Sequence, residues 1–216
     1  PTTSYHLRPH SGWLNDPNGM TFRDGVWHVF FQHNPAAPQH WRIAWGHAVS
    51  DDLANWRLLP VAFGPTPGGP DSSGCWSGVF LPGHERPGVV YSGIADESGA
   101  STVCLRWGSP DLVTWDAPVV VAPTPDLDEI AVMRDPFVFE LDGRPLAILG
   151  AGRRDGTPVV LLFDRQNELA WRYLGLFVAD DPVLAAAATA DVWECPQLFR
   201  LGESWVLLVS ILDGDR

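Results

Sequence analysis

The chain has 216 residues, of which 45% are hydrophobic, and a formal net charge of −12 from 14 Lys and Arg against 26 Asp and Glu. A surface this acidic repels nucleic-acid phosphates and anionic lipids, so we expect neither nucleic acid nor a membrane as a partner. The 11 Trp, 21 Gly and 20 Pro favour many short strands joined by tight turns over a helical bundle. The composition therefore predicts an all-β fold.

Two motifs recur in step, about once every sixty residues. The first opens each unit, and its copies are separated by 59 or 60 residues. These copies are Asn15-Asp16-Pro17, Gly74-Cys75-Trp76, Arg134-Asp135-Pro136 and Glu194-Cys195-Pro196. The second motif is Ser-Asp-Asp-Leu-Ala-Asn-Trp at 50–56 and Ser-Pro-Asp-Leu-Val-Thr-Trp at 109–115, with a weaker copy ending at Trp171. Its tryptophans, Trp56, Trp115 and Trp171, lie between apolar runs and are expected to pack in the core.

Each unit contains four short strand-like runs, which is the content of one propeller blade. Hairpin turns are predicted at Asp24-Gly25, Asp142-Gly143 and Gly202-Glu203. The expected blades are about 10–65, 72–123 and 132–180, followed by the start of a fourth at about 191–216. A β-sandwich is the alternative, although it gives no reason for the constant spacing. Because the fourth unit stops at Arg216, we expect 1–216 to be one partial propeller domain of roughly three and a half blades.

The first corner contains Asp16 followed by Pro17 and Asn18-Gly19. Proline favours an extended conformation in the residue before it, and Asn-Gly tolerates the positive φ of a tight turn. We therefore expect an extended Asp16 followed by a tight turn, which together aim one carboxylate. An Asx turn, in which Asp16 only accepts hydrogen bonds from backbone amides, is the alternative for this motif alone.

The third and fourth corners place two carboxylates in different surroundings. Arg134 precedes Asp135, so the pKa of Asp135 is expected to be lowered and its carboxylate ionised. Glu194 lies between Trp193 and Cys195, an apolar setting that is expected to raise its pKa, as a general acid requires. Equivalent corners of successive blades face one axis, so Asp16, Asp135 and Glu194 are expected to converge.

This combination predicts glycoside hydrolysis. One carboxylate attacks the anomeric carbon, a protonated one supplies the proton of the leaving group, and a third stabilises developing positive charge. The chain has no GxSxG, P-loop or HExxH motif, and its histidines lack metal-ligand spacing, so no cofactor and no metal site are expected. The segment Gly150-Ala151-Gly152 is only half of a dinucleotide fingerprint, and the RRDG that follows it at 153–156 reads as a turn.

The three cysteines, Cys75, Cys104 and Cys195, are odd in number and form no CxxC pair. A chain of this size needs no disulfide, so reduced thiols in a cytoplasmic protein are expected. The N-terminal residues carry no apolar signal core, but the chain also lacks an initiator Met, so a removed leader is left open. The sequence leaves the oligomeric state undetermined.

The motifs at Trp13–Gly19, Arg134–Pro136 and Glu194–Pro196 resemble the three signature motifs of glycoside hydrolase family 32. Shorter matches occur in family order at Phe30-Phe31-Gln32, Trp45-Gly46-His47-Ala48 and Trp76-Ser77-Gly78. The resemblance covers about residues 6–201. It implies a five-bladed propeller, usually followed by a C-terminal β-sandwich that this chain lacks.

The resemblance also implies roles for single residues. Asp16 would be the nucleophile of a retaining reaction, Asp135 the transition-state stabiliser and Glu194 the acid/base. The implied substrate-binding residues are Asn15, Gln32, Trp41, Trp45, Trp76, Ser77 and Arg134, with either Trp41 or Trp45 in the aromatic wall. The stretch His40-Trp41-Arg42 departs from the family pattern, which often reads Trp-Gly-Asn before Trp-Gly-His.

The resulting hypothesis is release of terminal β-D-fructofuranosyl units from sucrose or related fructosides. Fructan exo-hydrolysis and fructosyl transfer use the same carboxylates and stay open, as does the choice among sucrose, sucrose 6-phosphate, inulin and levan. An inverting arabinosidase or xylosidase with the same propeller would need carboxylates farther apart. An inactive sugar-binding relative is the alternative from another functional class.

Overall fold

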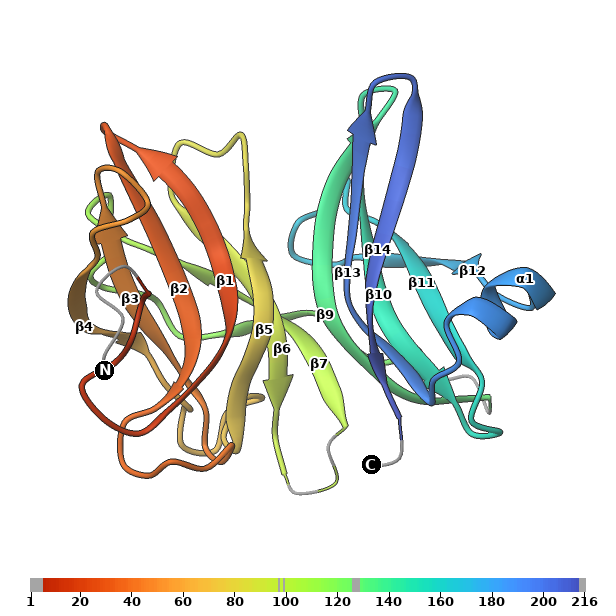
Figure 1. Cartoon of the computed structure of the whole chain (residues 1–216), viewed down its shortest axis with the longest axis horizontal. Coiled ribbons are helices and arrows are strands. Elements are labelled where there is room, and N and C mark those ends of the chain that lie inside the picture. The colour runs from red at the N-terminus through yellow and green to blue at the C-terminus, as the bar shows by residue number, and fades with distance from the viewer. Residues whose placement is uncertain (1–5, 97, 99, 126–128, 214–216) are drawn as a thin grey trace.

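The computed structural model describes residues 6–96, 98, 100–125 and 129–213. Three four-stranded antiparallel sheets and one two-stranded sheet follow one another along this part of the chain (Figure 1). The short helix α1 (Pro182–Ala187) precedes the last sheet, and the side chain of Asp181 caps it by accepting from the amides of Val183 and Leu184. The predicted all-β class is confirmed. No helix in the described part of the chain is long and apolar enough to cross a membrane.

Consecutive strands pair in every sheet, so each sheet is a simple meander. The first sheet contains β1 (Trp13–Arg23), β2 (Val26–Asn34), β3 (Ala44–Ser50) and β4 (Arg57–Phe63). The second contains β5 (Gly74–Phe80), β6 (Gly88–Ile94), β7 (Ser101–Trp107) and β8 (Val119–Ala122). The third contains β9 (Ile130–Leu141), β10 (Arg144–Arg153), β11 (Pro158–Asp164) and β12 (Arg172–Val178). The last pairs β13 (Val192–Leu201) with β14 (Ser204–Leu212).

The first two strands of three sheets are joined by the turns that the sequence predicts. Asp24 and Gly25 have φ values of 51° and 83°, and Asp142 and Gly143 have φ values of 50° and 75°. Positive φ at both central residues defines the type I′ turn, whose twist matches that of the flanking strands. Gly202 likewise has a φ of 62° between β13 and β14. These hairpin predictions are confirmed.

The second repeated motif forms one kind of turn in the first two sheets. The hydroxyls of Ser50 and Ser109 donate to Oδ1 of the aspartate two residues later, which in turn accepts from the backbone amide two residues beyond it in both copies. Leu53 and Leu112 both have positive φ, at 63° and 60°. The repeat in the sequence therefore encodes a repeated corner between the third and fourth strands.

The hydrophobic cores lie between neighbouring sheets. Trp45 and Tyr91 belong to the core between the first and second sheets, where both are fully buried. The core between the second and third sheets includes Trp171, and a smaller one between the third and last sheets includes Trp193. Trp115 packs against the first of these cores, and Trp56 packs against a fourth cluster within the first sheet. The predicted core role of Trp56, Trp115 and Trp171 is confirmed.

The turn predicted at residues 153–156 is confirmed, because the amide of Gly156 donates to the carbonyl of Arg153 at 3.1 Å and Gly156 has a φ of 87°. The preceding residues Gly150, Ala151 and Gly152 lie inside β10, paired with both β9 and β11. A Cβ atom on Gly150 would lie 2.1 Å from the carbonyl oxygen of Trp193, and one on Gly152 would lie 2.5 Å from that of Asp191. The two glycines are therefore needed because the backbone at the start of the last sheet lies directly on β10.

We predict that Gly150→Ala lowers the free energy of unfolding by about 1–3 kcal/mol, because the added methyl group forces the third and last sheets apart. Urea unfolding followed by tryptophan fluorescence measures this change. The matched control is Gly64→Ala, where the new Cβ would meet only the Cβ of Ala44 at 3.5 Å. The control is expected to be neutral or slightly stabilising, and equal stability of the two variants would contradict the packing argument.

Candidate active site

The first strand of each sheet is irregular at the repeated corner. The pairing with the next strand shifts between Asn15 and Pro17, Cys75 and Gly78, Arg134 and Phe137, and Glu194 and Gln197. A β-bulge bends its strand and re-aims the side chains beside it. Asp16, Asp135 and Cys195 adopt positive φ at these bulges, with values of 30°, 59° and 46°. Residues other than glycine rarely adopt this conformation, so the surrounding structure must hold it in place.

The expectation of an extended Asp16 followed by a tight turn is wrong. Asp16 has positive φ, and β1 continues through Asn18 and Gly19 to Arg23 without a hairpin. The reason is that β2 pairs with β1 on both sides of the irregularity, which turns the Pro-Asn-Gly segment into part of a bulged strand. The corner nevertheless aims one carboxylate, because the bulge does what the turn was expected to do.

Two buried polar side chains hold the carboxylate of Asp16. The amide nitrogen of Gln32 donates to its Oδ2 at 2.8 Å, and the hydroxyl of Ser77 donates to the same oxygen at 2.7 Å. Gln32 also contacts Ser77 at 2.5 Å, and each side chain is only 4% exposed. Gln32 comes from β2 and Ser77 from β5, so the first two sheets together fix this carboxylate.

Asp135 lies deepest in the site, at 6% exposure. Its Oδ2 accepts from the backbone amide of Cys195 at 3.0 Å, and its own amide donates to the hydroxyl of Ser92 at 2.7 Å. Burial, together with the negative charges of Glu194 and Asp16, raises the pKa of Asp135 to about 7, although the hydrogen bond from the Cys195 amide and the charge of Arg134 oppose the shift. The predicted lowering of this pKa is wrong, because burial outweighs the favourable effect of Arg134.

Arg134 is an ion-pair partner of Glu194. Its Nη1 atom donates to Oε1 of Glu194 at 3.0 Å, and its guanidinium carbon lies 5.3 Å from the ring centre of Trp76. The predicted apolar surroundings of Glu194 are therefore wrong in part. Adjacent residues of a strand point to opposite faces, so the indole of Trp193 packs in the core and donates to the carbonyl of Ala188.

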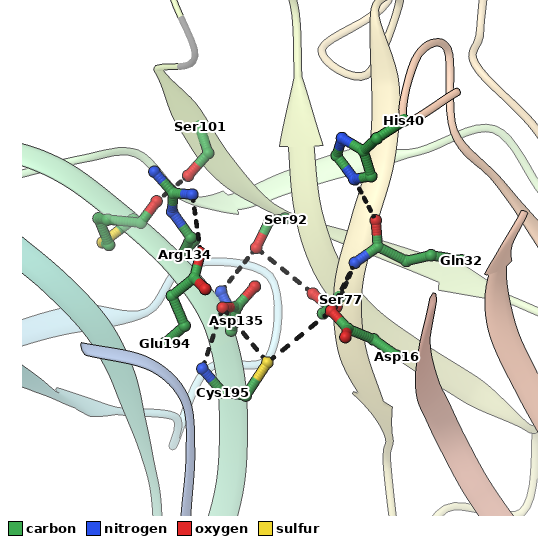
Figure 2. Close-up of polar contacts among 11 residues, drawn as sticks. Asp16, Gln32, His40, Ser77, Ser92, Ser101, Arg134, Asp135, Glu194 and Cys195 are labelled. Carbon is green, nitrogen blue, oxygen red and sulfur yellow. Dashed lines mark hydrogen bonds and ion pairs between the residues drawn. The ribbon is translucent and has the colours of Figure 1, made fainter. Parts of the chain in front are cut away.

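The thiol of Cys195 lies between two carboxylates (Figure 2). Its sulfur is 3.6 Å from Oδ2 of Asp135 and 4.0 Å from Oδ2 of Asp16. Burial raises the pKa of this thiol far above its ordinary value, and the neighbouring carboxylates add to the effect. Cys195 thus contributes a protonated, neutral thiol. A thiolate at this position would be strongly repelled by the neighbouring carboxylates. All three cysteines are free.

The convergence of three sheets is the central feature of the site. Asp16 comes from the first sheet, Asp135 from the third and Glu194 from the last. Cys195 contacts the first two carboxylates, and Arg134 joins the third to the strand that carries Asp135. A cavity of about 550 Å³ lies beside this corner, lined by residues 17–21, 77–84, 135–138 and 195–197 among others. Among the described residues, no group of three or more His, Cys, Asp or Glu side chains is arranged to hold a metal ion.

The remaining predicted binding residues have different surroundings. Asn15 accepts from the indole of Trp13 at 2.6 Å, and the half-buried ring of Trp76 faces Arg134. Trp41 is 61% exposed, and its ring lies next to Arg42.

For Trp45 the prediction of an aromatic wall is wrong. Its side chain is fully buried in the core, and its indole donates to the carbonyl of Trp76 at 3.0 Å. Position 45 lies in β3, a strand buried along its whole length between β2 and β4, so the ring supports the site from behind.

Two residues of the site were not predicted from the sequence. Ser92 is a buried hydroxyl within an otherwise apolar β6, and this isolated polar residue was the available signal. His40 contacts Gln32 and lies between the rings of Trp13 and Trp76. The departure of residues 40–42 from the family pattern marked the segment, but gave no indication of which side chain would reach the site.

Three carboxylates from separate sheets gather around one centre, and carboxylates are the groups that glycosidases use for catalysis. The chain belongs to glycoside hydrolase family 32, because the model of the Glycosyl hydrolases family 32 N-terminal domain matches residues 6–214. Its sheets are accordingly blades of a β-propeller. Among curated proteins, the chain is 34% identical over 214 residues to the sucrose-6-phosphate hydrolase of Bacillus subtilis strain 168, covering 95% of this chain and 43% of that protein.

Solved structures give the same relationship. The fructan 1-exohydrolase IIa of Cichorium intybus superposes with a TM-score of 0.75 at 32% identity, over 92% of this chain and 37% of that one. A GH32 β-fructofuranosidase variant of Bombyx mori, solved in complex with sucrose, superposes with a TM-score of 0.80 at 27% identity. That comparison covers 98% of this chain and 45% of the Bombyx mori chain. The chain thus spans less than half the length of these relatives.

We predict a pH-dependent gain in stability from Asp135→Asn. The pKa of Asp135 is 3.8 in an ordinary setting and about 7 in the fold, so the stability that this carboxyl contributes is fully present below pH 4 and lost as the pH rises through 7. Asparagine keeps the oxygen acceptor and cannot ionise. The variant should therefore gain on the order of 2–4 kcal/mol over the parent at pH 8 relative to pH 4.

Urea unfolding of both proteins at the two pH values measures this difference. Asp51→Asn, at an exposed position after β3, is the control and is expected to change the free energy of unfolding by less than about 0.5 kcal/mol at either pH. An equal gain for Asp135→Asn at pH 4 and pH 8 would show that burial does not hold this carboxyl in its protonated form.

Proposed function

We propose that the full-length protein is a retaining β-fructofuranosidase, which releases terminal β-D-fructofuranosyl units from sucrose or related fructosides. The observation that carries the proposal is the meeting of Asp16, Asp135 and Glu194 from three different sheets around the thiol of Cys195. Family membership and the sucrose complex of the Bombyx mori relative support a fructoside as the substrate.

In the first step, Asp16 attacks the anomeric carbon of the fructosyl unit. The hydrogen bonds to Asp16 from Gln32 and Ser77 and the 4.0 Å contact from the thiol of Cys195 all fall on Oδ2. They fix the carboxylate plane, and within the described residues Oδ1 accepts no hydrogen bond that would compete with the substrate. As the new carbon–oxygen bond forms, the glycosidic bond breaks, and the leaving oxygen takes the proton of Glu194.

Among the residues that the structure describes, Glu194 is held for this proton transfer through one of its oxygens, Oε1. Arg134 binds Oε1 at 3.0 Å, and the glutamate side chain is 25% exposed, so Oε2 can reach a leaving group. The two negative charges repel each other when Asp135 and Glu194 are both ionised, because these residues lie at the same corner of the site. Substrate hydroxyls that donate to Asp135 would stabilise its ionised form, which is the form that can stabilise positive charge on the substrate.

In the second step, water attacks the anomeric carbon from the side that the leaving group has vacated. The Glu194 carboxylate takes a proton from this water, the ester bond to Asp16 breaks, and the nucleophile is regenerated. Asp135 lies beside the position of the developing positive charge and is proposed to stabilise it in both steps. Transfer to a sugar hydroxyl instead of water uses the same groups.

The remaining polar groups are proposed to bind the fructosyl unit. The set comprises Asn15, Gln32, Trp76, Ser77 and Arg134. Ser77 and Gln32 are buried beneath the nucleophile, whereas Trp76 and Arg134 form a cation–π pair beside Glu194. Indole rings pack well on the apolar faces of sugars, which makes Trp76 the proposed aromatic surface.

We also propose that the three four-stranded sheets and the final hairpin are about three and a half blades of a five-bladed propeller. The approximate boundaries are those expected above, 10–65, 72–123, 132–180 and 191–216. The support is the regular succession of sheets, each packed on the next through an apolar core, together with the 43% share of the Bacillus subtilis relative that the chain covers.

The test is an assay of the full-length protein on sucrose, sucrose 6-phosphate, inulin and levan. We expect fructose release from at least one of these, lowered by at least about 10⁴-fold in Asp16→Ala and by about 10²–10⁴-fold in Glu194→Ala. Glu203→Ala, in the exposed hairpin between β13 and β14, is the matched carboxylate control and should keep full activity. A wild-type protein that releases no fructose from any of the four would refute the proposal.

Proton NMR within the first seconds of turnover tests retention. A retaining enzyme releases β-fructofuranose before it equilibrates, and an inverting enzyme releases the α anomer. Added azide should partly restore the activity of Glu194→Ala and yield fructosyl azide, because azide needs no general base to attack the covalent intermediate. Initial release of the α anomer would contradict the role of Asp16 as nucleophile.

A further inference from the structure

The imidazole of His40 touches the residue that holds the nucleophile. Its Nε2 atom lies 3.0 Å from Oε1 of Gln32, whose Nε2 atom donates to Asp16 at 2.8 Å. His40 belongs to the loop between β2 and β3, whereas Gln32 lies within β2. In Figure 2 the three side chains form one line from His40 through Gln32 to Asp16.

The donor and acceptor atoms of the three side chains determine the direction of each hydrogen bond in this line. An ionised carboxylate only accepts, so Gln32 must present its NH₂ group to Asp16. The amide oxygen of Gln32 then faces His40 and needs a donor. Only an N–H at Nε2 of the imidazole can supply it, which fixes both the tautomer of His40 and the orientation of the amide.

The surroundings of His40 favour this arrangement. The imidazole meets the ring of Trp13 edge-on at 6.0 Å between centroids and the ring of Trp76 at 5.3 Å. Burial lowers the pKa of His40, although Asp16 and a backbone hydrogen bond oppose the shift. A neutral imidazole carries a single N–H. The contact with Oε1 of Gln32 requires that this N–H is at Nε2.

We propose that His40 is a positioning residue for the nucleophile, and this inference rests on the function proposed above. Its Nε2–H group holds the amide of Gln32 in the orientation that donates to Asp16. Without that donor the amide can turn over and place its oxygen against the carboxylate. Acceptor would then face acceptor, and the carboxylate would leave the orientation needed for attack. A displacement of about 1 Å at a reacting group costs on the order of 10²-fold in rate.

Two substitutions distinguish the effect of losing the N–H donor from the effect of losing the aromatic ring. His40→Phe keeps a planar aromatic side chain between Trp13 and Trp76 but has no N–H. His40→Gln loses the ring, yet can place an amide N–H near the position of Nε2. We expect kcat of the full-length protein on its best substrate to fall by about 10–100-fold in His40→Phe, with KM changed less than about threefold. His40→Gln should recover most of this loss.

The loss in His40→Phe should be the same at every pH between 5 and 8, because both the neutral and the cationic imidazole carry Nε2–H. A double-mutant cycle provides a further readout. In the Gln32→Ala background, His40→Phe should change kcat by less than about twofold, since the residue through which it acts is gone. Equal losses in both backgrounds, or a loss confined to low pH, would overturn the proposal.

A measurement that needs no turnover uses the imidazole itself. A long-range ¹H–¹⁵N spectrum of the full-length wild-type protein, with the His40 signals identified by their absence in His40→Phe or His40→Gln, reports the tautomer. We expect Nε2–H at neutral pH, and Nδ1–H would overturn the proposal even if His40→Phe failed to fold. If the wild-type protein is inactive on all four substrates the proposed function fails, whereas an active wild type with an equally active His40→Phe refutes only the role of His40.

Discussion

The site of this chain depends on three backbone positions with positive φ. Asp16, Asp135 and Cys195 lie at bulges in the first strands of three sheets, and each would be more relaxed in a regular strand. The bulges turn the attached groups toward one centre, where Asp135 Oδ2 accepts from the amide of Cys195 and lies 3.6 Å from its sulfur. The backbone therefore determines how the charged groups converge. Gln32 and Ser77, which donate to Asp16, and Ser92, which accepts from the amide of Asp135, hold these groups in place.

Close packing of the third and last sheets also brings the groups of the site together. Gly150 and Gly152 let the backbone before and at the start of β13 lie on β10, within a distance that no Cβ atom would permit. That contact places the strand carrying Glu194 beside the strand carrying Asp135, and Arg134 then reaches the glutamate. The glycines of the third sheet and the ion pair of the site are thus two parts of one packing arrangement, and a change in either alters the distance between two carboxylates.

The sequence predicts the repeat, the hairpin turns and the convergence of the three carboxylates, because each depends on local chemistry or on constant spacing. Prediction from the sequence fails where burial of a side chain determines its pKa or its role. The pKa of Asp135 follows from its 6% exposure rather than from the adjacent arginine, and Trp45 is a core residue because β3 is buried along its length. The bulge at Asp16 was read as a turn, since Pro-Asn-Gly is compatible with both and only pairing with β2 distinguishes them. His40 could not be found, because its contact depends on the path of a loop.

The thiol of Cys195 has a chemical consequence for the durability of the site. Thiolates, rather than thiols, react with peroxides and alkylating reagents, and burial together with the carboxylates beside this sulfur opposes its ionisation. Among the groups of this site, a cysteine is ordinarily the one most sensitive to oxidation. In this chain burial and the carboxylates that are proposed to carry out the reaction keep the sulfur protonated, so this corner should tolerate mildly oxidising surroundings without a dedicated reductant.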